Sequence, residues 1–479
     1  MAIPQLPNVD GLLVTADNPA RADLLGIGMD HARCAALHNY LIHNAWISEG
    51  RPPAALHGNN INTYFTTHGG AAEALRPRLH PSLAAFLDDA RLPPDGLERA
   101  PFFFWANEFT SPGEFFAEPE ADLFDEPADS LVCLYSTNIG QGGSSGGGLF
   151  YHQGIHRAAV FMHMDDHDFA LPVQAHLELW HPLETVLSNW IELIRLGKIT
   201  ASPREAAPLF VGEKIGPWEW HPYSEAQVNS CVHAWDRLCN AIESRMPPSP
   251  STPANPPEPE PEPLLAPPAL DAASIPSPSF ARAFLSRARR PHFRSIAPGL
   301  LLPPASAASF TASQPFTHLP HPPQVVPPVC IFPAANSDLQ ADVTGWLNPF
   351  HEAFREPPAP SRVPAGVYTE SVDRSVLDTA EEGFRLLLPY GLHGDSARKS
   401  DGSGVSAGSA TELFQHGYKP FGGDYYRPQR LERLLDHWCG LVVRGVWDVG
   451  PRGVEGEVER FREADGAARW RDYVISPTW

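Results

Sequence analysis

Apolar residues recur every three to four positions in five stretches of the chain, the spacing that gathers them on one side of a helix. The fourth stretch opens with Ser224 and Gln227, which are spaced as a capping box. The third begins at a proline and ends at a glycine, as helices commonly do. The five predicted helices cover Asp30–Ser48, Leu79–Leu92, Pro182–Gly197, Ser224–Met246 and Pro428–Val443.

Between these helices lie shorter, almost uninterrupted apolar runs. Leu131–Ser136 and His156–Met164 are of the kind expected for fully buried strands in parallel sheets. Strands and helices that alternate predict an α/β fold with a mostly parallel, Rossmann-like sheet and flanking helices. Ligands of such sheets bind at the carboxyl ends of the strands. The polar segments that follow the two runs should therefore lie together at one edge of the sheet.

Prolines divide the chain into three parts. Of the 53 prolines, 23 lie between Pro247 and Pro328. Proline fixes φ and lacks a backbone donor, so it fits neither helix interiors nor central strands. We expect an α/β catalytic region at 1–245 and a long, disordered Pro-rich segment at 246–330. A C-terminal α/β region at 331–479 would pack on the first region or complete it.

Composition narrows the classes of function. No apolar run of the 479 residues reaches the length of about 18 that spans a bilayer. The start lacks the features of a signal peptide, so we expect a cytoplasmic protein without a membrane partner. The net charge of −21 argues against broad affinity for DNA. Arg282–Arg294 is one compact basic stretch, either a solvated patch or a tether for an anionic partner such as RNA. The six cysteines are scattered and show no zinc-site spacing.

A glycine-serine segment follows the first strand-like run. It carries Ser144 and Ser145, and Ser136 precedes it. Gly143–Gly147 satisfies the G-x-S-x-G pattern, but no good helix follows, as a nucleophile elbow requires. No Gly-Lys-Ser/Thr closes a phosphate loop, so we expect no nucleotide cofactor. The glycines would let backbone N–H groups approach an anion, although such a segment is equally typical of a flexible surface loop.

The second strand-like run ends in the sequence HMDDHD, which contains Asp165, Asp166, His167 and Asp168. His163 and Asp165 match the H-x-D of a facial iron triad, although no distal histidine can be placed. Carboxylates and imidazoles that pair, relay protons or bind an amine or guanidinium explain the cluster better. We therefore expect no bound metal.

Two segments contain the pattern D-x-x-E. Asp95 and Glu98 lie in a predicted turn, whereas Asp378 and Glu381 lie in a predicted helix. On a helix, residues at i and i+3 share a face, so two carboxylates can hold one cation or move a proton. Solvated acids at a helix N-terminus would give the same pattern.

The segments GGGLFYHQGIHRAAVFMHMDDHDF, LWHPLETVLSNWIELIRLGKI and PWEWHPYSEAQVNSCVHAWDRLCNAIESRMP resemble the fungal arginine-containing cyclodipeptide synthases. The resemblance covers about Ser136–Met246 and, less clearly, Asp378–Leu434. It implies an enzyme of secondary metabolism that condenses arginine and a second amino acid, both from aminoacyl-tRNAs, into a diketopiperazine. It also associates a D-x-x-E motif with activity, which points to Asp378 and Glu381, with Asp95 and Glu98 as the competing pair.

The chemistry that the resemblance implies requires an acyl acceptor or positioning hydroxyl, a base for the attacking amine, and carboxylates for a guanidinium. Ser144 or Ser145 and His167 would supply the first two, and no cofactor is needed because an aminoacyl-tRNA is already an activated ester. The expected substrate-contacting residues are Ser136, Asp165, Asp166, Asp168 and Glu184. A metal-dependent oxygenase or hydrolase, and a non-catalytic protein tethered by its Pro-rich segment, remain the alternatives.

Overall fold

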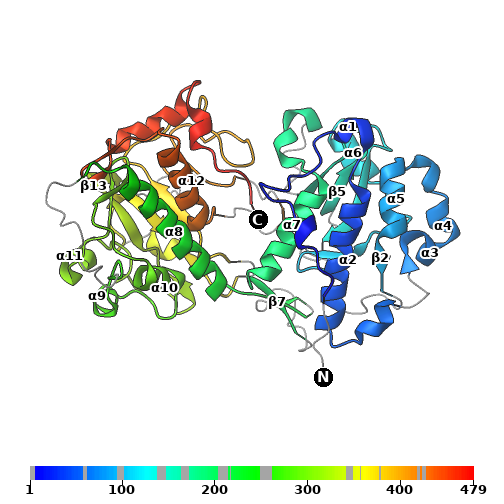
Figure 1. Cartoon of the computed structure of the whole chain (residues 1–479), viewed down its shortest axis with the longest axis horizontal. Coiled ribbons are helices and arrows are strands. Elements are labelled where there is room, and N and C mark those ends of the chain that lie inside the picture. Colours follow the sequence, from blue (N-terminus) through cyan, green and yellow to red (C-terminus); the bar gives the residue numbers. More distant parts are fainter. Residues whose placement is uncertain are drawn as a thin grey trace.

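The computed structural model shows two lobes side by side, one from the blue and cyan half of the chain and one from the green to red half (Figure 1). Separate apolar cores form the two lobes, the first over residues 9–220 and the second over residues 228–475, with Phe421 reaching back into the first. The structure describes residues 6–57, 62–93, 102–137, 147–162, 172–202, 214–215, 217–248, 262–340, 349–355, 358–376, 379–417, 421–422 and 428–478.

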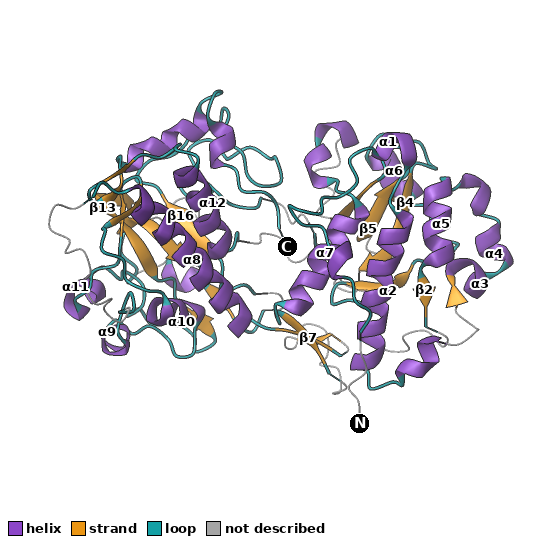
Figure 2. Ribbon diagram, viewed as in Figure 1, coloured by secondary structure: helices purple, strands orange, loops and turns teal. Residues whose placement is uncertain are grey.

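An antiparallel sheet in the order β3-β4-β5-β6 forms the centre of the N-terminal lobe. Its strands are β3 (Ala106–Phe109), β4 (Leu131–Thr137), β5 (Gly148–His152) and β6 (Arg157–Phe161). The helices α2 (His31–Ser48), α5 (Pro81–Asp89) and α7 (Leu183–Arg195) share one core with this sheet (Figure 2). The smaller elements are α1 (Leu24–Ile27), α3 (Tyr64–His68), α4 (Gly70–Glu73), α6 (Glu118–Leu123), β1 (Asn62–Thr63), β2 (Arg91–Leu92), β7 (Ile199–Ala201), β8 (Lys214–Ile215) and β9 (Trp218–Trp220).

Both faces of this sheet are buried, which explains its uninterrupted apolar strands. On β5, Leu149 and Tyr151 pack on the helices, whereas Phe150 points into a second cluster with Phe124 and Trp180. Side chains alternate between the two faces of a strand, so two covered faces leave no polar positions. The α/β class is confirmed, but the expected parallel, Rossmann-like sheet is wrong here: β4, β5 and β6 form an antiparallel meander.

The C-terminal lobe contains a seven-stranded sheet in the order β16-β14-β13-β11-β10-β18-β17. Among the described strands, β10 and β18 form the parallel pair, and the other pairings are antiparallel. Its strands are β10 (Ser295–Ala297), β11 (Leu300–Leu301), β13 (Cys330–Gln340), β14 (Arg362–Thr369), β16 (Phe384–Leu387), β17 (Val449–Gly450) and β18 (Gly453–Val454), and a separate pair comprises β12 (Val325–Val326) and β15 (Val372–Asp373). The helices are α8 (Glu225–Arg245), α9 (Pro267–Ala272), α10 (Phe280–Arg287), α11 (Ala307–Ala312) and α12 (Leu431–Val443).

The boundary between the lobes lies before α8, not after it as the proline pattern predicts. Trp235 of α8 is fully buried in the C-terminal core, stacks on Phe332 and donates its indole N–H to the carbonyl of Arg289. The five predicted helices are confirmed, including the capping box of Ser224 and Gln227 at the start of α8. The amphipathic pattern therefore located α8 correctly but did not tell which core it joins.

The expectation of disorder over 246–330 is wrong from Glu262 onward. Residues 262–330 contain α9, α10 and α11, and Phe280, Phe284 and Leu265 are buried in the C-terminal core. Proline is compatible with this order where it falls in a first helical turn, as Pro267 does in α9. Residues 249–261 lie outside the described part of the chain. Among the described helices none is long and apolar enough to cross a membrane.

We predict that Trp235→Ala destabilises the C-terminal lobe by about 3–5 kcal/mol, because it removes a large buried ring and leaves a cavity. Denaturant unfolding followed by hydrogen exchange measures the effect. Protection should fall in α8, β13 and α12 and persist in β4–β6. Ser244→Ala, at an exposed position of the same helix, is the control. Equal loss of protection in β4–β6 would contradict the assignment of α8 to the second core.

Candidate functional site

The two polar segments singled out in the sequence begin at one edge of the N-terminal sheet. Ser136 pairs with Gly148 on β5, and Gly148 pairs in turn with Phe161 on β6. Next to them, the hydroxyl of Thr137 donates to the carbonyl of Met162 at 3.5 Å. The glycine-serine segment and the HMDDHD segment therefore leave the sheet from adjacent points. The described ends of the two segments, Thr137 and Met162, are thus neighbours, although the strands run antiparallel. Residues 138–146 and 163–171 lie outside the described part of the chain, so the convergence of their side chains stays a prediction.

Ser136 itself is half-buried at this edge, and its hydroxyl accepts a hydrogen bond from the Asn107 amide at 3.3 Å. The same amide donates to the carbonyl of Thr137, so Asn107 fixes the end of β4 just before the glycine-serine segment. Most of the other predicted site residues lie outside the described residues. They are Asp95, Glu98, Ser144, Ser145, Asp165, Asp166, His167, Asp168 and Asp378.

Glu184 is described, and it is completely buried in the first turn of α7. One carboxylate oxygen accepts the backbone N–H of Arg21 at 3.0 Å, and the other accepts the thiol of Cys34 at 3.6 Å. The pKa of the Cys34 thiol is raised well above its usual value, mainly by burial and secondly by the nearby Glu184 carboxylate. The carboxylate therefore faces a neutral thiol and a backbone donor.

Two tyrosines and a histidine extend this buried polar group across the sheet. The phenol of Tyr135 hydrogen-bonds Nδ1 of His38 at 2.9 Å, and Nε2 of His38 lies 2.9 Å from the carbonyl of Arg91. Burial lowers the pKa of His38 to about 4, so the ring is neutral near pH 7. Burial likewise raises the pKa of Tyr135 and of Tyr151 well above the usual value.

Glu381 does not occupy the helical position that the D-x-x-E pattern predicts. The residues after it form β16, and Glu381 itself lies in the turn before that strand. Its carboxylate is buried and accepts a charge-assisted bond from Arg374 at 2.6 Å and the N–H of Phe280 at 3.1 Å. These contacts fix α10 beside β16. The helical prediction failed because the apolar run after Glu381 is a buried strand, which periodicity alone does not separate from a helix.

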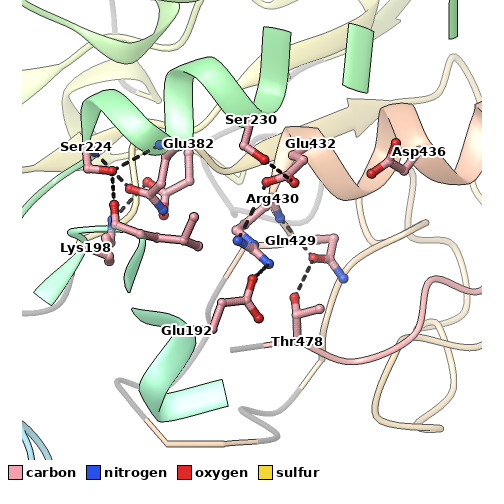
Figure 3. Close-up of polar contacts among 12 residues, drawn as sticks. Glu192, Lys198, Ser224, Ser230, Glu382, Gln429, Arg430, Glu432, Asp436 and Thr478 are labelled. Atoms are coloured by element: carbon pink, nitrogen blue, oxygen red, sulfur yellow. Dashed lines mark hydrogen bonds and ion pairs between the residues drawn. The ribbon is translucent and has the colours of Figure 1, made fainter. Parts of the chain in front are cut away.

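The neighbouring Glu382 joins the two lobes through a buried ion pair (Figure 3). Lys198 of the N-terminal lobe is fully buried and donates to Glu382 at 2.9 Å and to the carbonyl of Pro222 at 2.7 Å. The second oxygen of Glu382 accepts the Gln227 side-chain amide at 2.9 Å. Gln227 also accepts the N–H of Ser224, so the ion pair is tied to the cap of α8.

Arg430 makes a second set of contacts at the lobe junction (Figure 3). Its guanidinium lies 3.5 Å from Glu192 of α7 and 3.7 Å from Glu432 of α12. Gln429 beside it receives the N–H of Arg430 and contacts the hydroxyl of Thr478 near the C-terminal end. Sequence reasoning identified only the capping residues of this junction, because a single lysine or arginine carries no periodic signal.

The basic stretch of α10 is engaged within the C-terminal lobe. Arg282 pairs with Asp271, Arg287 with Glu225, and Arg289 with Glu243, at 2.5, 2.6 and 2.8 Å. Arg287 at the end of α10 and Arg289 just after that helix therefore connect this segment to α8. This favours a structural role for these arginines over a tether for RNA.

No group of three or more histidine, cysteine or acidic residues suited to a metal ion occurs among the described residues, which do not include HMDDHD. All six cysteines are free thiols. Comparisons with protein-family models, with curated proteins and with solved structures gave no match for this chain.

We predict that Lys198→Met and Glu382→Gln each destabilise the protein by about 3–5 kcal/mol, because each leaves an uncompensated buried partner. The double variant should cost clearly less than the sum of the two, as a double-mutant cycle in denaturant will measure. Arg237→Gln, which breaks an exposed pair with Asp436, is the control and should cost less than about 1 kcal/mol. Additive losses for the buried pair would contradict direct coupling.

Proposed function

We propose that this chain is a cyclodipeptide synthase that condenses arginine and a second amino acid from aminoacyl-tRNAs, in the cytoplasm, into a diketopiperazine. The proposal rests on the sequence resemblance over about Ser136–Met246. The observation that supports it is the shared origin of the glycine-serine and HMDDHD segments at one sheet edge. The two segments carry hydroxyls, carboxylates and an imidazole, which are the groups this chemistry needs.

The reaction that these groups would serve is acyl transfer from an activated ester. The amine of one aminoacyl group attacks the ester carbonyl of the other, a peptide bond forms, and the tRNA hydroxyl leaves. Attack of the remaining amine on the second ester closes the ring and releases the second tRNA. We assign His167 as the base that takes the amine proton, Ser144 or Ser145 as the hydroxyl that positions the attacked ester, and Ser136 and the aspartates to substrate contacts. No cofactor enters these steps.

The contacts of Glu381 indicate a structural role for this residue and thus weaken the case that the D-x-x-E residues take part in the reaction. A buried carboxylate held by Arg374 and by a backbone N–H has the environment of a structural group. The antiparallel sheet also departs from the parallel sheet expected from the sequence. The proposal therefore depends on the sheet edge and not on Asp378 and Glu381. The packing of residues 262–330 into the second core argues against a protein that acts only through a free Pro-rich tether.

We predict that a host expressing the chain accumulates an arginine-containing diketopiperazine that the empty vector lacks. His167→Gln should lower its yield by about 10²-fold or more, the usual loss for a missing proton-transfer group. Asp165→Asn should also lower the yield, because it removes a carboxylate assigned to substrate contact. Mass spectrometry of the metabolites measures the yield, and thermal melting confirms that each variant is folded.

Asp129→Asn serves as the matched control, since the exposed carboxylate of Asp129 pairs with Arg78 on the surface of the same lobe. Soluble, folded protein that gives no new mass in a host with a full tRNA pool would contradict the proposal. Elemental analysis of the same protein then tests the metal-dependent alternative, for which one transition metal per chain would be the positive result. Loss of product in Glu381→Gln at an unchanged melting temperature would restore the D-x-x-E assignment.

A further inference from the structure

Residues 10–23, which we call the N-terminal strap, cross the surface above Glu184. None of these residues is buried. In Figure 1 the strap is the dark blue segment that runs between α7 and α2 toward α1. Leu12 and Leu13 are half-buried against the N-terminal core, and polar contacts also hold the strap. A surface segment without a fully buried side chain belongs to the less stable parts of a fold and opens locally.

Polar contacts from two helices hold the strap in place. Arg33 of α2 donates to the carbonyls of Leu12, Pro19 and Asn18 at 2.6, 2.9 and 3.0 Å. On α7, the hydroxyl of Ser188 accepts the N–H of Val14 at 3.0 Å. One arginine side chain thus supplies three of the bonds that close the strap.

The strap ends in an exposed apolar turn. Leu25 and Ile27 of α1 are 76% and 61% exposed, the two most exposed large apolar side chains among the described residues. Leu24 at the start of this turn and Met29 just after it are buried, so the turn is anchored on both sides while Leu25 and Ile27 remain in water. Ordering the strap costs conformational entropy. Apolar side chains that stay in water contribute almost no burial free energy to offset that cost.

Beneath the strap, the Glu184 carboxylate has an incomplete set of partners. Within the described residues no lysine, arginine or histidine forms an ion pair with it, and its bonds come from the strap backbone at Arg21 and from Cys34. A buried carboxylate without a cation is costly unless it is protonated or paired. When the strap lifts, the bond from Arg21 is lost and one oxygen of Glu184 becomes free for another N–H donor.

We propose that the N-terminal strap is a lid over a cation-binding site formed by Glu184 and Cys34, and that the site takes a guanidinium or ammonium group of a small molecule. The ligand N–H donors replace the backbone N–H of Arg21 on Glu184. The positive charge supplies the ion pair that this carboxylate lacks in the closed lobe. The choice of a guanidinium probe rests on the proposed function, whereas the lid itself does not.

Alkylation of the native protein by iodoacetamide, read out by peptide mass spectrometry, tests the lid. Cys34, Cys231 and Cys239 are all essentially unexposed, and burial raises the pKa of all three thiols. Cys231 and Cys239 lie on α8 in the other core, so they report opening that is unrelated to the strap. We expect Cys34 to react at least about tenfold faster than either, as local opening of a weakly held segment implies.

Arg33→Gln removes three of the bonds that hold the strap, while those to Ser188 and Glu184 and the Asp10–Arg195 ion pair remain. We expect it to accelerate Cys34 alkylation by a further tenfold or so. The nearby Arg33 charge lowers the thiol pKa, so its loss alone would slow the reaction. Acceleration therefore reports opening and not altered thiol reactivity. Arg237→Gln is the matched control on α8. Equal rates at the three cysteines in both wild type and Arg33→Gln, or equal acceleration at all three, would overturn the lid.

Addition of L-argininamide to wild type and to Arg33→Gln tests the ligand. We expect it to slow Cys34 alkylation at least threefold, with no effect from Nα-acetyl-L-citrullinamide, which carries neither a guanidinium nor an ammonium group. No protection by L-argininamide, or the same protection by both, would overturn the cation site. Because this readout does not depend on product formation, a protein that shows protection without a diketopiperazine would refute the proposed function and keep the site.

Discussion

The buried ion pair between Lys198 and Glu382 is the contact on which the arrangement of the two lobes depends. Two separate cores meet at a polar junction, and no strand of one sheet is hydrogen-bonded to the other among the described strands. Burying two charges costs several kcal/mol of desolvation, which their attraction offsets only with good geometry and further hydrogen bonds. Pro222 and Gln227 provide those bonds, so the pair specifies one orientation of the lobes more than it adds stability.

The same junction shows why the lobes are joined and yet distinct. Phe421 leaves the C-terminal lobe and packs in the N-terminal core, where Trp190 donates its indole N–H to the Phe421 carbonyl at 2.7 Å. Gly422 beside it has a φ of +105°, and a Cβ there would lie 2.9 Å from the ring of Trp105. A side chain at that position would be strained in its backbone and would clash with the indole. Glycine is therefore required where the second lobe touches the first core.

The sequence predicted elements well and their partners poorly, for a physical reason. Amphipathic helices such as α2 and α8 were located to within a few residues, because 3.6-residue periodicity survives in any context. The parallel sheet and the boundary after residue 245 were wrong, because continuous apolar strands report two covered faces and not strand direction. Proline counting failed over 262–330 because composition ignores the buried side chains between the prolines. Of the predicted site, the strand ends that precede the two polar segments are neighbours, whereas Glu381 lies in a turn and not in the expected helix.

Buried polar groups in this protein fall into two kinds, and the difference bears on where chemistry can occur. Glu381 and Glu382 each have a cationic partner and an amide donor, so their charge is satisfied and fixed. Among the described residues, Glu184 is hydrogen-bonded by a thiol and by a backbone N–H of a surface segment. A carboxylate of the first kind holds elements of the fold together. If it is disturbed, its ion pair is broken and the folded state loses stability. One of the second kind gains an ion pair when its cover is exchanged for a cation. The energetics thus favour ligand exchange in the N-terminal core and permanence at the lobe junction.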